Sequence, residues 1–374
     1  MRRRTGGWQR WTRKAALSGL LLAASCRTTG ATGRHEGAPA SSESRSGDVA
    51  LDTLNDEELF AGGTAAFAAG DFRQAARHFD RLVDFHSRSR HRRAALFSAG
   101  LAHERQQEWA RALLRFSELA EPKAGTGDAL EASYRSAETL YHLERYDEAA
   151  ALLDVLANRD DLPVGRRLEA QVQKGVCELE SGKKEKAEAT LRDALTHYSA
   201  LSDPDEVDDY FPAQAQFFLG ELYRLHYEDV KLAADKGVDQ LTRDLEYKAE
   251  LLLSAQGHYL RSIRFGNGHW ATAAGAQIGA LYENLYEHMV HAPAPPELSA
   301  AEAEAYRLEI RKKIRVLLTK SINVYEQTLE AAERIGSQNT FVDRTRESLR
   351  KVKALLLADA EPGSPAAETA PASD

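Results

Sequence analysis

Small and apolar residues between positions 51 and 203 recur as a repeating pattern with helical spacing. Four alanines mark the repeat at intervals of 37, 37 and 38 residues; each has a large apolar residue four positions later and a small residue twelve positions earlier. The alanines are Ala75, Ala112, Ala149 and Ala187, the large residues Phe79, Phe116, Leu153 and Leu191, and the small residues Gly63, Gly100, Ala137 and Gly175. Residues four apart share one face of a helix, so each repeat is predicted to be two helices joined by a short turn.

The small residue gives each predicted pair a close contact. We expect it to let the alanine of the second helix approach, with the large residue filling the space one turn further on. Replacing Ala112 or Ala149 with leucine should then overpack the contact by about 1–3 kcal/mol. Residues at the predicted turns, such as Glu108 and Glu144, should be replaceable at almost no cost.

The pattern continues less regularly after residue 203. Phe217–Tyr223 predicts a fifth first helix, and its partner, Leu245–Ile263, is delayed by a polar stretch from Asp229 to Asp244. Ala271–Tyr286 predicts a sixth first helix. No run of alternating apolar residues bounded by turn signals predicts a strand.

The C-terminal part is predicted to be helical without a clear repeat. After the proline-rich segment 292–296, Ser299 and Glu302 form the capping-box pattern that opens a helix, which we expect to extend to about Ile335. A last helix, Val342–Leu357, carries many charges and is expected to cap the stack.

These repeats resemble the tetratricopeptide repeat (TPR), which places small residues, alanine and phenylalanine at these offsets with a period of about 34 residues. The period here is longer, and the usual tryptophan and terminal proline are missing. Each helix pair leaves an apolar face uncovered, so neighbouring pairs must stack. The predicted fold is an all-α, TPR-like helical-repeat solenoid with a long C-terminal helical extension.

The N-terminus has the pattern of an export signal. Six basic residues within the first 14 positions precede an apolar run, Ala15–Ser25, which is too short to span a bilayer. The run ends in Leu22-Ala23-Ala24-Ser25-Cys26, which resembles a lipobox, the motif at which bacterial lipoprotein precursors are cut before a lipid-modified cysteine. An ordinary secretory signal or a short uncleaved anchor is the alternative. Arg27 is not the aspartate that retains many lipoproteins on the inner membrane, so the resemblance implies the periplasmic side of the outer membrane.

The predicted organisation has six parts, of which the tether and the tail are too poor in bulky apolar residues to fold. They are a signal peptide (1–25), the lipidated cysteine with a disordered tether (26–50), four TPR-like repeats (51–203), two divergent repeats with an insertion (204–292), a long helix with a capping helix (293–359) and a disordered tail (360–374).

Charge and cysteine content narrow the functional classes. The chain has a net charge of -8, and removal of the six basic residues of the signal leaves about -14. Nucleic-acid binding requires clustered Lys and Arg, so we expect no nucleic-acid partner. If Cys26 carries lipid, Cys177 has no cysteine to pair with and is expected to be a small buried hydrophobe.

The sequence predicts no enzyme, no metal site and no cofactor. It lacks phosphate-binding loops, zinc-protease motifs and dinucleotide fingerprints. His288 and His291 could share a helix face, but a solvated pair is the better interpretation. The basic run 88–93 is interpreted as a solvated turn, with contact to an acidic partner or phosphate as the alternative.

The TPR resemblance implies a protein-binding groove lined by set positions of each first helix. Aromatic residues and arginine at such positions are typical of protein-binding hot spots. The alternative is that a shifted register or a flanking helix makes these residues part of the core. The predicted groove residues are Phe60, Phe67, Phe97, Arg105, Tyr134, Tyr141, His142 and Phe217.

The resemblance therefore implies a non-catalytic protein–protein interaction scaffold, held by lipid on the outer membrane, whose partners are other envelope proteins or peptide segments. Such lipoproteins serve envelope complexes such as gliding-motility, secretion or pilus machines. The whole chain most resembles the TPR lipoprotein of the myxobacterial adventurous gliding-motility machinery. The alternatives are a β-barrel assembly or pilotin-type accessory lipoprotein, or a peptidoglycan- or glycan-related binding module or enzyme.

Overall fold

The structure is a computed structural model that describes residues 51–203, 207–232, 238–292, 294 and 298–358. The predicted signal, Cys26, the tether and the acidic tail lie outside the described residues. The described residues form 13 helices and no strand, which confirms the predicted all-α helical-repeat solenoid. The chain divides after Asp161 into two compact units.

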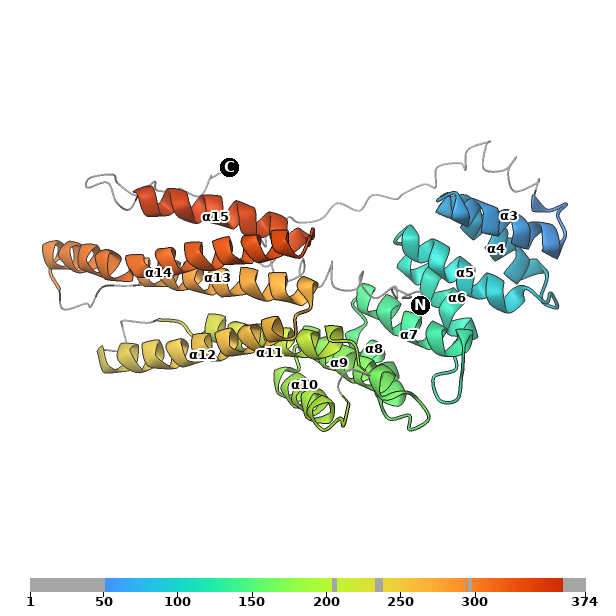
Figure 1. Cartoon of the computed structure of the whole chain (residues 1–374), viewed down its shortest axis with the longest axis horizontal. Coiled ribbons are helices and arrows are strands. Elements are labelled where there is room, and N and C mark those ends of the chain that lie inside the picture. The colour runs from blue at the N-terminus through green and yellow to red at the C-terminus, as the bar shows by residue number, and fades with distance from the viewer. Residues whose placement is uncertain (1–50, 204–206, 233–237, 293, 295–297, 359–374) are drawn as a thin grey trace, which may run out of the picture. The chain divides into compact units, whose positions relative to one another are not determined.

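The first unit consists of three helix pairs in chain order (Figure 1). Within each pair the two helices pack on each other across a short turn. The pairs are α3 (Asp56–Ala68) with α4 (Phe72–Phe85), α5 (Arg92–Arg105) with α6 (Trp109–Leu119), and α7 (Asp128–His142) with α8 (Tyr146–Ala157).

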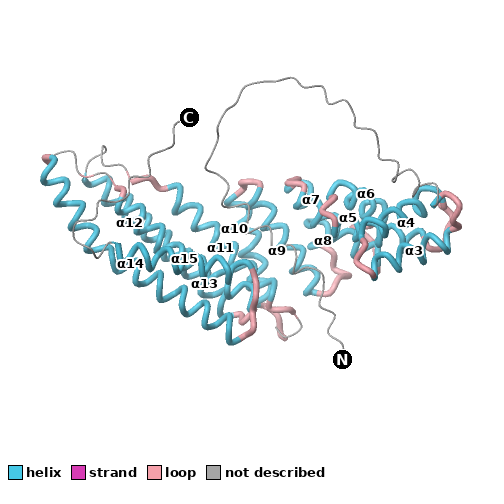
Figure 2. Tube along the Cα trace, turned by 90° about the horizontal axis from the view of Figure 1, so that it is seen from above, coloured by secondary structure: helices cyan, strands magenta, loops and turns pink. Residues whose placement is uncertain are grey.

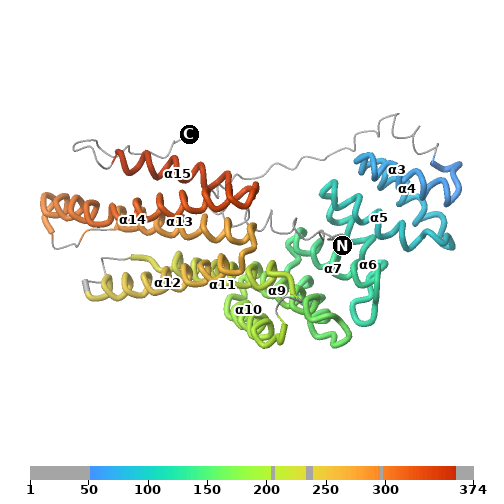
Figure 3. Tube along the Cα trace, in the orientation of Figure 1, coloured from blue at the N-terminus to red at the C-terminus, as the bar shows by residue number. Residues whose placement is uncertain are grey.

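The second unit has three further pairs and a final single helix, which Figure 3 follows from green to red. Figures 1 and 2 both show α13, α14 and α15 side by side, and all three pack on one another. The helices are α9 (Val164–Glu180), α10 (Lys184–Ser199), α11 (Tyr210–Asp229), α12 (Val238–Arg264), α13 (Gly268–Val290), α14 (Ala300–Arg334) and α15 (Thr340–Ala358).

In three of the four regular repeats the glycine of the first helix lies directly against the large residue of the second. A Cβ added at Gly63 would lie 2.7 Å from the Phe79 ring, and one added at Gly100 would lie 2.5 Å from the Phe116 ring. The sequence correctly predicted a close contact here, but the large side chain rather than the alanine occupies the space above the glycine. The four alanines of the repeat are fully buried beside this contact.

The irregular helix pairs contain the same type of contact as the regular ones. Gly220 of α11 faces the Tyr259 ring of α12, and Gly279 of α13 faces the Tyr325 ring of α14. Helix α14 therefore occupies the second-helix position of a sixth pair, although the sequence indicated only a helical continuation. The relation was hidden because the second helices are long and start late, so that Tyr325 follows Gly279 by 46 positions rather than the 16 that separate Gly63 from Phe79.

Helix ends follow their sequence signals in two clear cases. Asn55 with Glu58 and Ser299 with Glu302 both form complete capping boxes, in which each side chain accepts a hydrogen bond from the other residue's backbone N–H. The second of these was predicted from sequence.

The charged residues of helix α15 face outward, as Arg346, Glu347 and Arg350 are exposed and Val352 is buried.

The turn between the two helices of a repeat requires one left-handed residue. Gly70 (φ 80°) and Gly182 (φ 79°) occupy this position in two of the first four repeats. Gln107 (φ 63°) and Glu144 (φ 60°) occupy it in the other two. A side chain with a Cβ is strained in this region, whereas glycine is not.

We therefore expect Gln107→Gly and Glu144→Gly each to stabilise the chain by about 0.5–1 kcal/mol, since removal of the strain outweighs the entropy that glycine loses on folding. Urea unfolding of each variant measures the effect. Ala110→Gly, at an exposed position inside α6, is the control and should destabilise. Equal destabilisation by all three variants would contradict this explanation of the turns.

Candidate functional site

The predicted groove residues fall into two groups in the structure. Phe60, Phe67, Phe97 and His142 are half-buried and Arg105 is exposed, whereas Tyr134, Tyr141 and Phe217 are buried. The expected partial exposure is thus wrong for the last three. Whether any of the eight residues binds a partner stays a prediction.

The half-buried aromatic residues pack on their own repeat or on the start of the next one as well as facing outward. The Phe60 ring stacks on His91 with 4.4 Å between centroids, and the Phe97 ring meets Phe116 edge-on at 5.8 Å. Phe67 contacts Phe72 at 5.2 Å, edge to face. These residues therefore extend the core of the first unit and present only part of their surface to a partner.

The remaining predicted positions of the first unit lie near the ends of α5 and α7. The Arg105 guanidinium lies 5.3 Å from the centroid of the Phe72 ring, and the His142 ring stacks on Trp109 at 4.0 Å. Tyr141 contacts Tyr146 edge-on at 5.3 Å. Tyr134 belongs to a stretch of α7, Ala132–Tyr141, in which every residue is buried. A helix buried over ten consecutive residues does not have the amphipathic pattern that the groove prediction assumed.

Phe217 belongs to the aromatic core of the second unit. Its ring lies 5.5 Å from Phe218, 5.6 Å from Tyr259, 5.0 Å from Trp270 and 6.4 Å from Phe341. Trp270 and Phe341 come from later helices, α13 and α15, which the sequence repeat did not place beside α11. The alternative that a flanking helix covers this position as core is therefore correct for Phe217.

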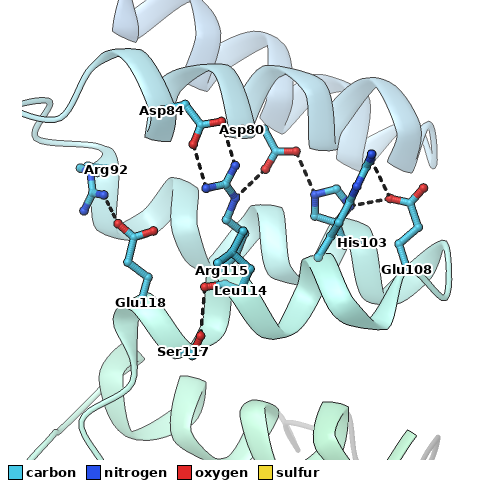
Figure 4. Close-up of polar contacts among 10 residues, drawn as sticks. Asp80, Asp84, Arg92, His103, Glu108, Leu114, Arg115, Ser117 and Glu118 are labelled. Atoms are coloured by element: carbon cyan, nitrogen blue, oxygen red, sulfur yellow. Dashed lines mark hydrogen bonds and ion pairs between the residues drawn. The ribbon is translucent and has the colours of Figure 1, made fainter. Parts of the chain in front are cut away.

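A polar network centred on one buried histidine joins α4, α5 and α6 (Figure 4). His103 of α5 is 2% exposed. Its Nε2 lies 2.9 Å from Asp80 Oδ2, and its Nδ1 lies 2.7 Å from Glu108 Oε2. Arg115 extends the network, since its Nε donates to Asp80 Oδ1 at 2.8 Å and it pairs with Asp84 at 2.8 Å. Sequence reasoning missed this network.

Two carboxylates on one imidazole require both ring nitrogens to donate, so His103 is an imidazolium in this geometry. Burial of His103 opposes the charge, but Asp80 and Glu108 outweigh it and raise the pKa of the ring. Burial likewise opposes the charge of Asp80, but His103 and Arg115 lower the pKa of its carboxyl group. Because Glu108 bonds to the buried His103, its replacement should reduce stability, whereas the sequence had indicated almost no cost.

The network predicts a pH dependence of stability. The raised pKa of His103 gives a stabilisation that is complete below the unfolded value of about 6.5 and is lost as the pH rises through the folded pKa. Urea unfolding should thus show a free energy of unfolding that decreases above neutral pH. His103→Gln should make the free energy of unfolding less dependent on pH in this range. An identical pH dependence in His103→Gln would show that the network carries no titrating histidine.

A second buried ionic cluster lies on the first helices α5 and α7. Arg135 Nη1 donates to Glu104 Oε1 at 3.0 Å and to Glu138 Oε2 at 3.3 Å, and Arg135 Nε lies 3.6 Å from Glu131. The side chains of Arg135, Glu104 and Glu138 are all at most 10% exposed. Arg135 thus links carboxylates of two successive first helices, α5 and α7.

The other residues that the sequence singled out have structural roles. Arg90 and His91 of the basic run both pair with Glu57. His288 stacks on Tyr227, and no group of three or more metal-ligating side chains occurs among the described residues. Cys177 is fully buried, and burial raises the pKa of its thiol, which fits the predicted small hydrophobe.

A cavity of about 560 Å³ lies between α14 and α15. Leu329, Ala332, Val342 and Leu349 give it an apolar lining. Its acidic residues all come from α14: Glu326, Glu330 and Glu333. Glu326 pairs with Lys353 at 2.6 Å, and Arg346, the basic residue of the lining, pairs with Asp343 at 3.0 Å. Glu330 and Glu333 therefore give the cavity its net negative charge.

Comparison with known protein families identifies the regular repeats. Residues 60–129, which run from α3 into α7 and contain the Gly63–Phe79 and Gly100–Phe116 contacts, match the family model of the tetratricopeptide repeat. Repeats of this type are modules for protein–protein interaction, and they bind other proteins or peptides.

Several solved structures are similar to the chain at low sequence identity. A TPR protein from Bacteroides fragilis is 12% identical, with 81% of this chain and 100% of that chain covered and a TM-score of 0.30. A TPR protein from Parabacteroides merdae is 13% identical, with 80% and 98% covered and a TM-score of 0.36. A Rap protein in complex with competence and sporulation factor is 12% identical, with 82% and 78% covered and a TM-score of 0.33.

No curated protein matches the chain. Within the part of the chain that the structure describes, no helix combines the length and the apolar character needed to cross a membrane.

Proposed function

We propose that this chain is a non-catalytic scaffold that binds other envelope proteins through its helical repeats. The observation that carries the proposal is one repeated helix contact, a small residue under a large one, which five of the six helix pairs show. Such an array forms an extended binding surface rather than a single enclosed pocket. Its first repeats match a family whose members bind proteins or peptides.

The second part of the proposal is a lipid anchor on the periplasmic side of the outer membrane. Its support is the lipobox-like sequence that ends at Cys26, with Arg27 after it. The process served is the assembly or stabilisation of an envelope complex such as a gliding-motility, secretion or pilus machine. The resemblance to the TPR lipoprotein of the myxobacterial adventurous gliding-motility machinery favours the first of these.

The binding surface that the geometry favours is the cavity between α14 and α15. In the six pairs each first helix is covered by a second helix, but α15 has no following partner among the described residues. An amphipathic helix of a partner could pack there as the missing second helix, with apolar residues against Leu329 and Leu349 and Lys or Arg near Glu330 and Glu333. The chain's own tail, 359–374, is unsuited because it has four acidic residues, no basic ones and three prolines.

The test is charge reversal at this cavity in the full-length lipidated protein. Glu330→Lys/Glu333→Lys should reduce the capture of partner proteins from detergent-solubilised envelopes at least tenfold, because basic residues of the partner would then be repelled. Glu304→Lys/Glu309→Lys changes the net charge equally on the same helix, outside the cavity, and should capture normally. Equal capture by both variants would exclude this cavity as the binding surface.

A glycan-binding module is the second candidate, since half-buried aromatic residues such as Phe60 and Phe97 could stack on sugar rings. Retention of the purified protein on peptidoglycan, together with normal capture by both charge-reversal variants, would favour it over the scaffold.

A further inference from the structure

A polar cluster with excess positive charge connects α10, α11 and α12. Arg192 Nη2 donates to Tyr223 Oη at 2.9 Å, and the Tyr223 ring stacks on His258 with 5.3 Å between centroids and 11° between planes. His258 Nδ1 lies 2.8 Å from Gln216 Oε1, which also accepts from Arg261 Nε at 3.2 Å. Two arginines from two helices thus flank one tyrosine–histidine stack.

The positive charges of this cluster exceed the negative ones. Glu188 is its carboxylate, and it is used by Arg192 at 2.8 Å and by the Tyr223 hydroxyl at 2.7 Å. Arg261 has an amide oxygen and no carboxylate as its partner among the described residues. Arg264 follows Arg261 by three positions on α12 and therefore lies on the same face of that helix. Partial desolvation of Arg261 and the nearby guanidinium groups of Arg192 and Arg264 lower the pKa of Arg261, so the three cations repel one another. This is unusual on a chain with a net charge of -8.

The histidine between the arginines is held neutral. His258 is 5% exposed, and burial together with Arg261 and Arg192 lowers its pKa to about 4. With a Gln216 oxygen as its acceptor, Nδ1 carries the ring proton. Tyr223, Gln216 and His258 therefore form a fixed, uncharged support, while the positive charge is held by the flanking guanidinium groups.

We propose that Arg192, Arg261 and Arg264 form an oxyanion site that binds a carboxylate or phosphate group beside the Tyr223–His258 stack. Guanidinium groups are matched to such anions because their planar N–H donors bind two oxygen atoms at once. A bound anion would also relieve the repulsion among the three cations. The site does not depend on the scaffold function or on the cavity between α14 and α15.

The experiment titrates the full chain with inorganic phosphate and, separately, with acetate, each against sodium chloride of equal ionic strength. Calorimetry measures affinity, and the imidazole NMR signal of His258 reports the place of binding, with His103, which belongs to the first unit, as the reference. Saturable binding that moves the His258 signal and leaves the His103 signal in place is the expected result. Binding of phosphate alone assigns the site to phosphoryl groups, and binding of acetate alone assigns it to carboxylates.

Matched arginine variants complete the test. Arg261→Gln should weaken binding at least tenfold while leaving the melting temperature nearly unchanged, because Arg261 is exposed. Arg243 is also exposed and on the same helix, and its side chain donates a hydrogen bond to Gln240. Arg243→Gln should bind the anion as the parent does. Absence of saturable binding of either anion, or equal binding by Arg261→Gln and the parent, would overturn the proposal.

Discussion

Replacing Phe116 with alanine is expected to destabilise the first unit by about 3–5 kcal/mol, the largest effect on folding that we predict. Phe116 is fully buried, and its ring lies on Gly100, where the two helices of the second repeat are closest. Truncation would remove this contact and leave a cavity. Gly100 has no side chain that could fill it. Chemical unfolding of the variant against the parent measures the loss.

The third repeat supplies a matched design for the same contact. It has Ala137 and Leu153, both fully buried, where the second repeat has Gly100 and Phe116. Gly100→Ala alone should overpack the contact by about 1–3 kcal/mol, since its Cβ would lie 2.5 Å from the ring. The double variant Gly100→Ala/Phe116→Leu transplants the third repeat's pair, so its loss should be smaller than the sum of the single losses. Strict additivity would mean that the two residues do not share one contact.

Replacing Cys26 with alanine is expected to move the protein from the membrane fraction to the soluble fraction almost completely. Each buried CH₂ of an acyl chain contributes about 0.8 kcal/mol, so loss of several chains removes stable attachment. Fractionation measures the distribution, and mass spectrometry of the mature N-terminus measures the lipid.

Cys177→Ala is the control, because Cys177 is the second of the two cysteines and lies buried in α9. It should remain in the membrane fraction. A Cys26→Ala protein that still sediments with membranes would contradict lipid anchoring.

The regular part of the fold was predictable because its signal is local and repeated. Ala75 and Phe79 lie on one helix, and the glycine that Phe79 covers is only 16 positions earlier, Gly63. The same contact at Gly279 and Tyr325 escaped prediction because length variation moved the partner 46 positions away. A search for glycine followed by a tyrosine at variable distance could have found it.

The candidate site was less predictable because it depends on contacts between helices. Phe217 was placed in the groove from its position on one helix, but Trp270 and Phe341 from two later helices bury it. The two partners of His103 likewise come from other elements, Asp80 from α4 and Glu108 from the N-cap of α6, and no spacing in the sequence indicates them. The left-handed turn residues were the exception, since Gln107 and Glu144 align with Gly70 and Gly182 at the repeat interval.

The central claim, that the repeats bind other envelope proteins, is tested most directly by cross-linking the lipidated protein in intact envelopes and mapping the cross-linked residues by mass spectrometry. We expect a small set of partner proteins to be cross-linked to residues between 56 and 358. The cross-links should be concentrated on α14 and α15. These cross-links should disappear in Glu330→Lys/Glu333→Lys and persist in Glu304→Lys/Glu309→Lys. Recovery of the uncross-linked protein alone, or of cross-links confined to residues outside the repeats, would contradict the scaffold function.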